Sequence, residues 1–300
     1  MSKASHSLAD DLSYCASVTR GGGSNLWFVS KMLPSAKKPL FAASYASMRF
    51  IDDLIDDDFL TMSQKDREEH REAYIRHIDD WELKSVGLRA ADNKAEDAIY
   101  RALAETVCLS NLGTAPWHNL AMAMKRDVNE EPIQDWDDFD RYSVGATVSP
   151  AVVYLYILLA NQKPDGVFHG PSSEQLYPMA QDMAIFCYLV HIMRDIAKDA
   201  AGCAQLLTIP YSLRDQLLAG SLPGNSLIAE IAEKAERHRR KMAPYVSHLS
   251  DEMPWAERKC FKALLAIYGK LFSNICRDPS CVFQEDPNEL DVMCREKAEA

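Results

Sequence analysis

Apolar residues recur at helical spacing through most of the chain. Between residues 39 and 60 they fall close to positions i, i+3 and i+4 of one another, which is the period of a helix with one buried face. Alternation over four or more residues, the pattern of a strand, is nearly absent. The sequence therefore predicts an all-α fold. The expected helices span residues 39–60, 64–81, 96–112, 117–128, 136–142, 144–159, 176–200, 227–245 and 254–277, and residues 201–211 are expected to form a loop.

The chain is expected to form a single domain over residues 1–300. It shows no repeat, no low-complexity tract and no linker, and 300 residues suffice to bury a core and still leave a ligand cavity. The core is expected over residues 14–277. Residues 285–300 form a polar tail, and the glycines at 21–23 are expected to act as a flexible hinge.

Charge and targeting patterns narrow the function classes. A net charge of −11 argues against a nucleic-acid partner and against broad adhesion to an anionic membrane. The N-terminus contains Asp10 and Asp11 and no continuous apolar stretch, so it does not resemble a secretory signal. The most apolar run, 144–160, contains Ser149 and Pro150 and is short for a membrane span. We expect a cytoplasmic protein.

The cysteine pattern agrees with that location. There is no CxxC pair and no histidine at zinc-site spacing, which favours reduced thiols that fill the core. The eight cysteines are Cys15, Cys108, Cys187, Cys203, Cys260, Cys276, Cys281 and Cys294.

A first acidic cluster lies in an apolar helical context. Asp52 and Asp56 are four residues apart, so on a helix they share one face and repel each other. The cluster also contains Asp53, and Arg49 adds a cation to the same face. Because a divalent cation with oxygen ligands would offset the repulsion, a metal site is a stronger interpretation here than a solvated acidic surface.

A second cluster repeats this arrangement far downstream. Asp195 and Asp199 are again four residues apart and follow Arg194, after several strongly apolar turns. Two such helices facing each other could bind two or three Mg²⁺ ions that bridge diphosphate oxygens. Arg49 and Arg194 would then act as fixed cations on a departing pyrophosphate.

At these residues the sequence resembles the squalene/phytoene synthase family, from about Tyr14 to Asn274. The family pattern Tyr-x-x-x-Arg-x-x-Asp-Asp-x-x-Asp matches Tyr45 to Asp56, and Arg-Asp-x-x-x-Asp matches Arg194 to Asp199. Tyr142 and Tyr268 resemble two further family tyrosines. The resemblance implies an isoprenoid synthase bundle with a central cavity, two Mg²⁺-binding aspartate motifs and an allylic diphosphate substrate. In the family the first product is a cyclopropylcarbinyl diphosphate.

Several positions depart from the family pattern. Asn25 stands within a usual Ser-Phe position, Tyr188 and His191 replace Gln and Asn, and Leu206 begins a segment that lacks the usual Arg and Tyr before Pro210. His191 could bind metal or hydrogen-bond an aspartate. The tyrosines Tyr45, Tyr142 and Tyr268 could contact pyrophosphate or a carbocation, or could be core aromatics.

The leading hypothesis is a Mg²⁺-dependent transferase that joins two farnesyl or geranylgeranyl diphosphates, of 15 or 20 carbons, and releases pyrophosphate. One alternative is a terpene-synthase-like lyase that ionises a single diphosphate, and another is a non-catalytic helical partner subunit. The sequence leaves the oligomeric state and any need for NADPH open. An apolar product suggests a peripheral membrane contact for its release, and Val148, Val152 and Leu155 are candidates for the floor of the tail pocket.

The aspartates Asp135, Asp137 and Asp138, by contrast, are expected to form a surface turn, and Asp57 and Asp58 to face water at the end of their helix.

Overall fold

The computed structural model describes residues 7–21, 24–92, 94–202, 204 and 208–283. Within these ranges the chain is a helical bundle, and its only strands are two residues long. The predicted polar tail 285–300, Gly22 and Gly23 of the predicted hinge, Leu206, Cys203 and Cys294 lie outside the described residues. In order, the elements are α1 (Leu8–Gly21), α2 (Asn25–Ser30), the 3₁₀ helix η1 (Ser35–Lys37), α3 (Lys38–Asp53), the π-helical segment η2 (Leu54–Phe59), α4 (Gln64–Ser85), α5 (Ala98–Ala104), the 3₁₀ helix η3 (Val107–Leu109), α6 (Ala115–Val128), α7 (Trp136–Ser143), the π-helical segment η4 (Val144–Val148), α8 (Ser149–Leu159), β1 (Asn161–Gln162), β2 (Phe168–His169), α9 (Ser173–Ala201), α10 (Tyr211–Leu218), α11 (Gly224–Glu252), α12 (Trp255–Arg277) and the 3₁₀ helix η5 (Pro279–Phe283).

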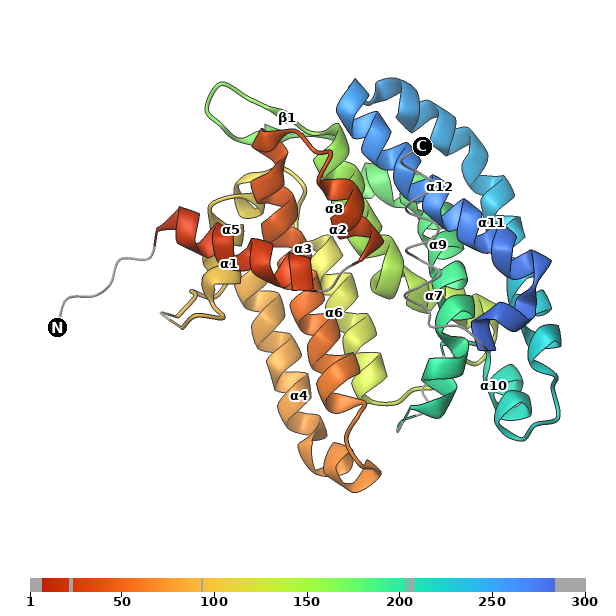
Figure 1. Cartoon of the computed structure of the whole chain (residues 1–300). Coiled ribbons are helices and arrows are strands. Elements are labelled where there is room, and N and C mark those ends of the chain that lie inside the picture. The colour runs from red at the N-terminus through yellow and green to blue at the C-terminus, as the bar shows by residue number, and fades with distance from the viewer. Residues whose placement is uncertain (1–6, 22–23, 93, 203, 205–207, 284–300) are drawn as a thin grey trace.

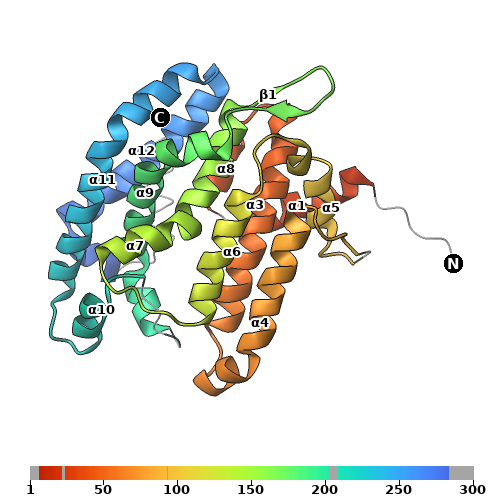
Figure 2. The ribbon, with the colours of Figure 1, turned by 180° about the vertical axis from the view of Figure 1, so that it is seen from behind.

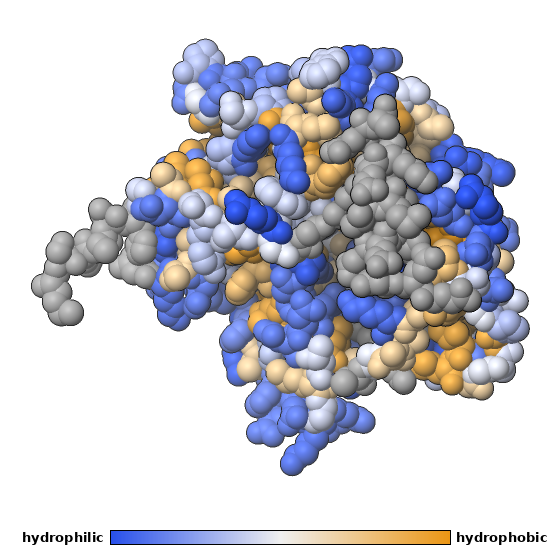
Figure 3. Space-filling model, viewed as in Figure 1, coloured by the Kyte–Doolittle hydropathy of each residue, from blue (hydrophilic) through white to orange (hydrophobic). Residues whose placement is uncertain are grey.

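The helices form two groups with α8 between them. On one side α1, α3, α4, α5 and α6 pack together, and on the other α9, α11 and α12 do so (Figures 1 and 2). The helix pair α9 and α11 shares the most extensive contact, and α8 touches both α6 and α9. The buried side chains of both groups belong to one continuous hydrophobic core. Polar residues dominate the face shown in Figure 3, with apolar residues in scattered patches.

The helix boundaries follow local sequence signals. Ser63 accepts a hydrogen bond from the backbone N–H of Asp66 and so caps α4, and Ser172 forms a capping box with Gln175 at the start of α9. Pro39 and Pro116 occupy the first turns of α3 and α6, where a missing N–H costs nothing.

The secondary-structure prediction differs from the structure in several places, and it omitted α1 and α2. The expected helix 96–112 ends at Ala104, where the Thr106 hydroxyl bonds the carbonyl of Ala102 at 2.6 Å and competes with the helical ladder. The helix α10 lies directly after the expected loop. The short hairpin of β1 and β2 turns through Gly166, whose φ of +87° suits glycine.

The segment Trp136–Leu159 runs through α7, η4 and α8 and is long and apolar enough to cross a membrane, since an 18-residue window within it has a mean hydropathy of 1.6. However, 67% of that window is buried inside the protein, where η4 and α8 pack on α6 and α9. Core helices of folded proteins have the same property. The cysteines that the structure describes are free thiols.

Candidate active site

The first aspartate motif lies where α3 changes into a wider turn. Leu60 donates its backbone N–H to the carbonyl of Ile55 at 2.9 Å, five residues back, and closes the π-helical segment η2. The expected regular helix 39–60 is therefore α-helical only as far as Asp53, and Asp56 projects from the wider turn. Single π-turns of this kind occur often at functional sites.

Arg49 neutralises part of this motif. Its guanidinium lies 3.6 Å from Asp52 and forms an ion pair with Asp53. Asp56 has no ion-pair partner among the described residues. Its carboxylate reaches solvent but is desolvated by the surrounding protein, as a group in a recess is. This desolvation, followed by the charges of Asp52 and Asp127, raises the pKa of Asp56 well above its ordinary value.

The second motif lies in the last turns of α9. Arg194 binds both carboxylate oxygens of Asp195 at 2.7 Å, and Nε2 of His191 lies 2.8 Å from Asp195 Oδ2. Burial alone would raise the pKa of Asp195, but Arg194 and then His191 lower it below its ordinary value. The same Nε2 lies 2.6 Å from Nη2 of Arg194, so His191 contacts both Asp195 and the arginine that binds it, and its role at a metal stays a prediction. Asp199 has no such partner among the residues that the structure describes, and burial followed by the charge of Asp195 raises its pKa to about 6.

The two motifs lie at the same end of the bundle. The C-terminal ends of α3, α6 and α9 point the same way (Figures 1 and 2). The charge of Asp199 is among the causes that raise the pKa of Asp56. Burial raises the pKa of Asp52, and the charges of Arg49 and His191 oppose that rise, so side chains of α9 act on those of α3 and η2. Helix C-termini already carry partial negative charge, and the carboxylates add to it. This end of the bundle is therefore built to attract a cation.

Sequence reasoning missed Asp127, in the last turn of α6. It is 7% exposed and accepts a hydrogen bond from the Tyr142 hydroxyl at 2.8 Å. Burial, opposed by this bond and supported by the charge of Asp52, raises its pKa to about 7. A signal was available, because Asp127 follows Leu120 and Met124 at helical spacing and so occupies the buried stripe of α6.

Tyr142 is both buried and linked to the carboxylates. Its ring packs under the guanidinium of Arg126 at 5.7 Å. Immediately after α7, Gly145 lies so close to α6 that a Cβ atom there would stand 2.2 Å from the carbonyl oxygen of Asn119. Only glycine therefore allows η4 to approach α6 closely enough to bring Tyr142 to Asp127.

The other two predicted tyrosines have different surroundings. Tyr45 donates a hydrogen bond to Ser24 Oγ at 2.6 Å and stacks on Phe41, with ring centroids 5.5 Å apart. It thereby ties α3 to the residue that caps α2. Tyr268 is half-buried in α12, which packs against α2, α9 and α11. The functional roles of both tyrosines stay predictions.

Asp138 corrects the expectation of a surface turn at 135–138. Asp135 caps α7 and is exposed, but Asp138 is buried and forms an ion pair with Arg126. The Arg126 guanidinium, against the opposing effect of burial, lowers the pKa of Asp138 to about 2. Asp138 thus joins α7 to α6 through a buried ion pair with Arg126. Asp57 and Asp58 are exposed, as expected.

The carboxylates fit a Mg²⁺ site completed by its ligand. Among the described residues, no three carboxylate, histidine or thiol groups converge as a ready-made metal centre. Mg²⁺ rarely needs one, because it commonly binds through one or two carboxylates, substrate phosphates and water. The hard oxygen donors and the unpaired charge of Asp56 and Asp199 suit that mode.

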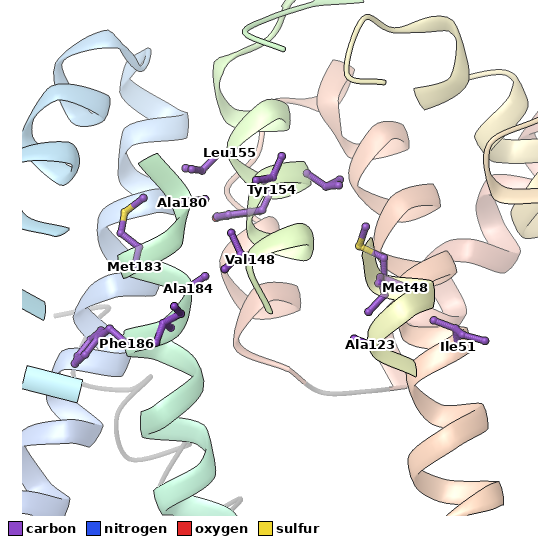
Figure 4. Close-up of a cluster of buried hydrophobic side chains, with 14 of the residues drawn as sticks. Met48, Ile51, Ala123, Val148, Tyr154, Leu155, Ala180, Met183, Ala184 and Phe186 are labelled. Atoms are coloured by element: carbon purple, nitrogen blue, oxygen red, sulfur yellow. The ribbon is translucent and has the colours of Figure 1, made fainter. Parts of the chain in front are cut away.

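The central substrate cavity stays a prediction. A cavity of about 420 Å³ lies at the far end of α4 and is lined by Leu8, Lys84, Tyr100 and Arg101 among others. A second of about 360 Å³ lies beside Leu217 and Phe283. Neither includes an aspartate of the two motifs. The candidate tail-pocket residues are buried, and Figure 4 shows Val148 and Leu155 beside Ala180 and Ala184 of α9.

The fold is shared with solved structures of known enzymes. A dehydrosqualene synthase in complex with ligand superposes with a TM-score of 0.68 at 18% identity, covering 97% of this chain and 96% of that one. A squalene synthase, HpnC from Alicyclobacillus acidocaldarius, gives a TM-score of 0.67 at 20% identity, covering 90% and 94%. The class defined by fold and site is that of a helical enzyme of the prenyltransferase type.

The chain belongs to the squalene/phytoene synthase family, whose sequence model matches residues 19–290. It is also 24% identical over 204 residues to a bifunctional lycopene cyclase/phytoene synthase of Blakeslea trispora. The match covers 64% of this chain and about a third, 32%, of that larger protein. The predicted family and the all-α isoprenoid synthase fold are confirmed.

Proposed function

We propose that the chain is a Mg²⁺-dependent prenyltransferase that joins two allylic prenyl diphosphates of 15 or 20 carbons head to head and releases pyrophosphate. The observation that carries the proposal is the pair Asp56 and Asp199, two carboxylates for which the structure gives no ion-pair partner among the described residues, the charge of Asp199 being one cause of the raised pKa of Asp56. An acidic site that binds an acidic substrate requires cations between the two.

The aspartates and arginines of the two motifs would have different roles. Asp52, Asp56, Asp195 and Asp199 would hold Mg²⁺, which when bound neutralises the diphosphate and makes it a better leaving group. Arg49 and Arg194 already stand against these carboxylates. When the aspartates bind metal, the two guanidinium groups can turn donors toward diphosphate oxygens. The apolar walls of α8 and α9 exclude water from the prenyl chains.

The test is to incubate the protein with Mg²⁺ and radiolabelled farnesyl or geranylgeranyl diphosphate and to size the products. A doubled carbon number supports the transferase. Products that keep the carbon number of the substrate would indicate the lyase, and no turnover would indicate a non-catalytic partner subunit. Asp56→Asn serves as the control, because it should abolish any product that depends on the proposed site.

A further inference from the structure

An exposed tryptophan and two exposed lysines form one stripe at the start of α12. Trp255, Lys259 and Lys262 are spaced by four and three residues, which places them on one helical face. Trp255 is 75% exposed, and the ammonium group of Lys259 lies over its ring, 5.7 Å from the centroid. Glu257 and Cys260 of the same turns are buried, so the stripe is the outward face of the helix.

Two further lysines extend this stripe onto neighbouring elements. Lys31 and Lys38 are exposed and lie on either side of η1. The helix α2, which ends just before Lys31, packs against α12. Lys37, next to Lys38, forms a buried ion pair with Glu257 at 2.8 Å and so holds η1 beside the first turn of α12. The basic tryptophan surface defined by these contacts consists of Lys31, Lys38, Trp255, Lys259 and Lys262.

The charge of this surface is opposite to that of the whole chain. The net charge is −11, yet α12 contains five basic residues and one acidic residue, Glu257, which is already paired with Lys37. Residues 24–51 include no acidic residue. Asp251 and Glu252, exposed at the end of α11, offset part of the positive charge. The four lysines of the surface outnumber these two carboxylates, so the surface is a positive region on an acidic protein.

An exposed indole beside lysines suits the headgroup layer of a lipid bilayer. The indole is apolar with one polar N–H group, and such rings collect at the boundary between headgroups and acyl chains. Lysines lay their apolar stems along that boundary and keep the ammonium group among anionic headgroups. Lys31 already packs in this way, with its ammonium group 5.6 and 5.4 Å from the ring centroids of Trp27 and Phe28. An acidic polypeptide would attract the lysines but offers the indole no apolar layer to enter.

The surface lies at the end of the bundle opposite the aspartate motifs. The turn between α11 and α12 and the start of α3 are at one end, and the C-terminal ends of α3 and α9 are at the other (Figure 1). An anionic bilayer on the basic tryptophan surface therefore stays far from the aspartates. Lys37 links this end to α8, because its ammonium group donates to the carbonyl of Leu158, in the last turn of α8, at 2.8 Å.

We infer that the basic tryptophan surface docks the protein on an anionic lipid bilayer, with the Trp255 indole in the headgroup layer. The negative net charge does not prevent this, because salt screens charges that lie more than about 10 Å from the bilayer. The binding goes beyond the proposed function and can be measured without substrate. Docking also brings the end of α8, the helix proposed to line the prenyl chains, to the bilayer, where an apolar product would be released. That last step alone rests on the proposed function.

The test is cosedimentation of the full chain with vesicles made of equal parts phosphatidylcholine and phosphatidylglycerol, and with vesicles of phosphatidylcholine alone. Trp255→Ala removes the indole, and Lys259→Glu reverses one charge of the surface. Two matched controls make the same kind of change elsewhere. Leu88→Ala removes another apolar side chain of a residue that is 76% exposed, and Lys65→Glu reverses an exposed charge at the start of α4. Circular dichroism checks that each variant is folded.

We expect wild type to bind the mixed vesicles at least about tenfold more tightly than phosphatidylcholine alone, since each lysine near an anionic surface adds about a fivefold preference. Added salt should weaken this binding. Trp255→Ala and Lys259→Glu should each lower binding to the mixed vesicles about fivefold or more. Leu88→Ala and Lys65→Glu should stay within about twofold of wild type.

Failure of wild type to bind the mixed vesicles overturns the inference. An equal loss in Lys65→Glu overturns it too, because binding would then follow net charge rather than this surface. Wild type that binds polyglutamate beads but no vesicles would indicate an acidic protein partner, and a lower molecular mass of Trp255→Ala in the absence of lipid would indicate contact with a second copy of the chain. Either result overturns the membrane assignment. No outcome depends on turnover, so failure of the docking and failure of the proposed function are distinguishable.

Discussion

The two aspartate motifs have the same spacing and a nearby arginine, yet their charges are balanced differently. In the first, Arg49 forms ion pairs with both Asp52 and Asp53, and Asp56 projects from a π-turn without an ion pair to any described residue. In the second, Arg194 forms an ion pair with Asp195, and His191 Nε2 lies 2.8 Å from the same carboxylate. In the first motif Asp56 is thus available to a cation, whereas in the second Asp195 is already paired with Arg194.

Both motifs nevertheless contain one carboxylate that has no ion-pair partner among the described residues, and the charge of Asp199 acts on Asp56. Asp56 and Asp199 have raised pKa values, and the charge of Asp199 is one cause of the shift at Asp56. Equal spacing in the sequence therefore does not mean equal roles. Asp56 and Asp199 are the carboxylates that a cation would neutralise. Asp195 binds Arg194 and so fixes the position of that guanidinium.

The largest effect is expected on turnover. Asp56→Asn or Asp199→Asn should lower pyrophosphate release about a thousandfold, since losing a metal ligand removes several kcal/mol of charge stabilisation and 1.36 kcal/mol corresponds to about tenfold. Asp52→Asn and Asp195→Asn should also reduce it by orders of magnitude. The matched control is Asp58→Asn, an exposed neighbour of the same segment, which should stay within about twofold. An equal loss of activity in Asp58→Asn would show that the motif aspartates have no special role compared with an exposed aspartate.

In the metal-free protein, replacing an aspartate by asparagine should change the free energy of unfolding in opposite directions in the two motifs. Asp195→Asn should lower the free energy of unfolding by about 1–3 kcal/mol, because Arg194 and His191 lose a charged hydrogen-bond partner. Asp56→Asn should raise it by a few tenths of a kcal/mol, because it removes repulsion. Urea unfolding in excess chelator measures both. Shifts of the same sign would show that the two motifs are electrostatically alike.

Substitutions away from both motifs sharpen the comparison, because they should change substrate preference and leave ionisation intact. Val152→Ala should favour the 20-carbon diphosphate over the 15-carbon one, and Leu155→Phe the reverse. Refilling such a pocket is worth roughly 1–3 kcal/mol, or about tenfold in a substrate ratio. Competition between the two diphosphates measures that ratio. An unchanged ratio in both variants would place the tail pocket elsewhere than beside α8.

The smallest effect is a pH dependence of the metal-free protein. Asp199 and Asp127 have pKa values raised to about 6 and about 7, so the folded chain keeps protons that the unfolded chain loses near pH 4. Their contribution to stability is therefore greatest below about pH 4 and is lost as the pH rises through 6 and 7. The difference in unfolding free energy between wild type and Asp127→Asn should fall across that window. A difference that grows with pH would contradict the raised pKa values.

Much of the fold was predictable because helical periodicity is a local signal. Asp52, Asp56, Asp195 and Asp199 could also be found, since acidic pairs interrupt strongly apolar helices. The π-turn at η2 could not, because it depends on packing around Leu60 rather than on a residue type.

The partners of charged groups were harder to predict, since they are set by contacts between distant elements. Asp138 was expected at the surface but pairs with Arg126 of another helix. Likewise, nothing local indicates that Tyr142 donates to Asp127, fifteen residues earlier. The apolar stripe of α6 would have identified Asp127 as buried, although not its partner.

The most direct test of the central claim is the metal dependence of pyrophosphate release. Asp56 and Asp199 have no ion-pair partner among the described residues, and the charge of Asp199 acts on Asp56, so the diphosphate should not bind productively unless Mg²⁺ lies between it and these carboxylates. We therefore predict that excess chelator abolishes pyrophosphate release from farnesyl or geranylgeranyl diphosphate and that added Mg²⁺ restores it. Undiminished release in excess chelator would contradict the claim that these carboxylates act through a bound cation.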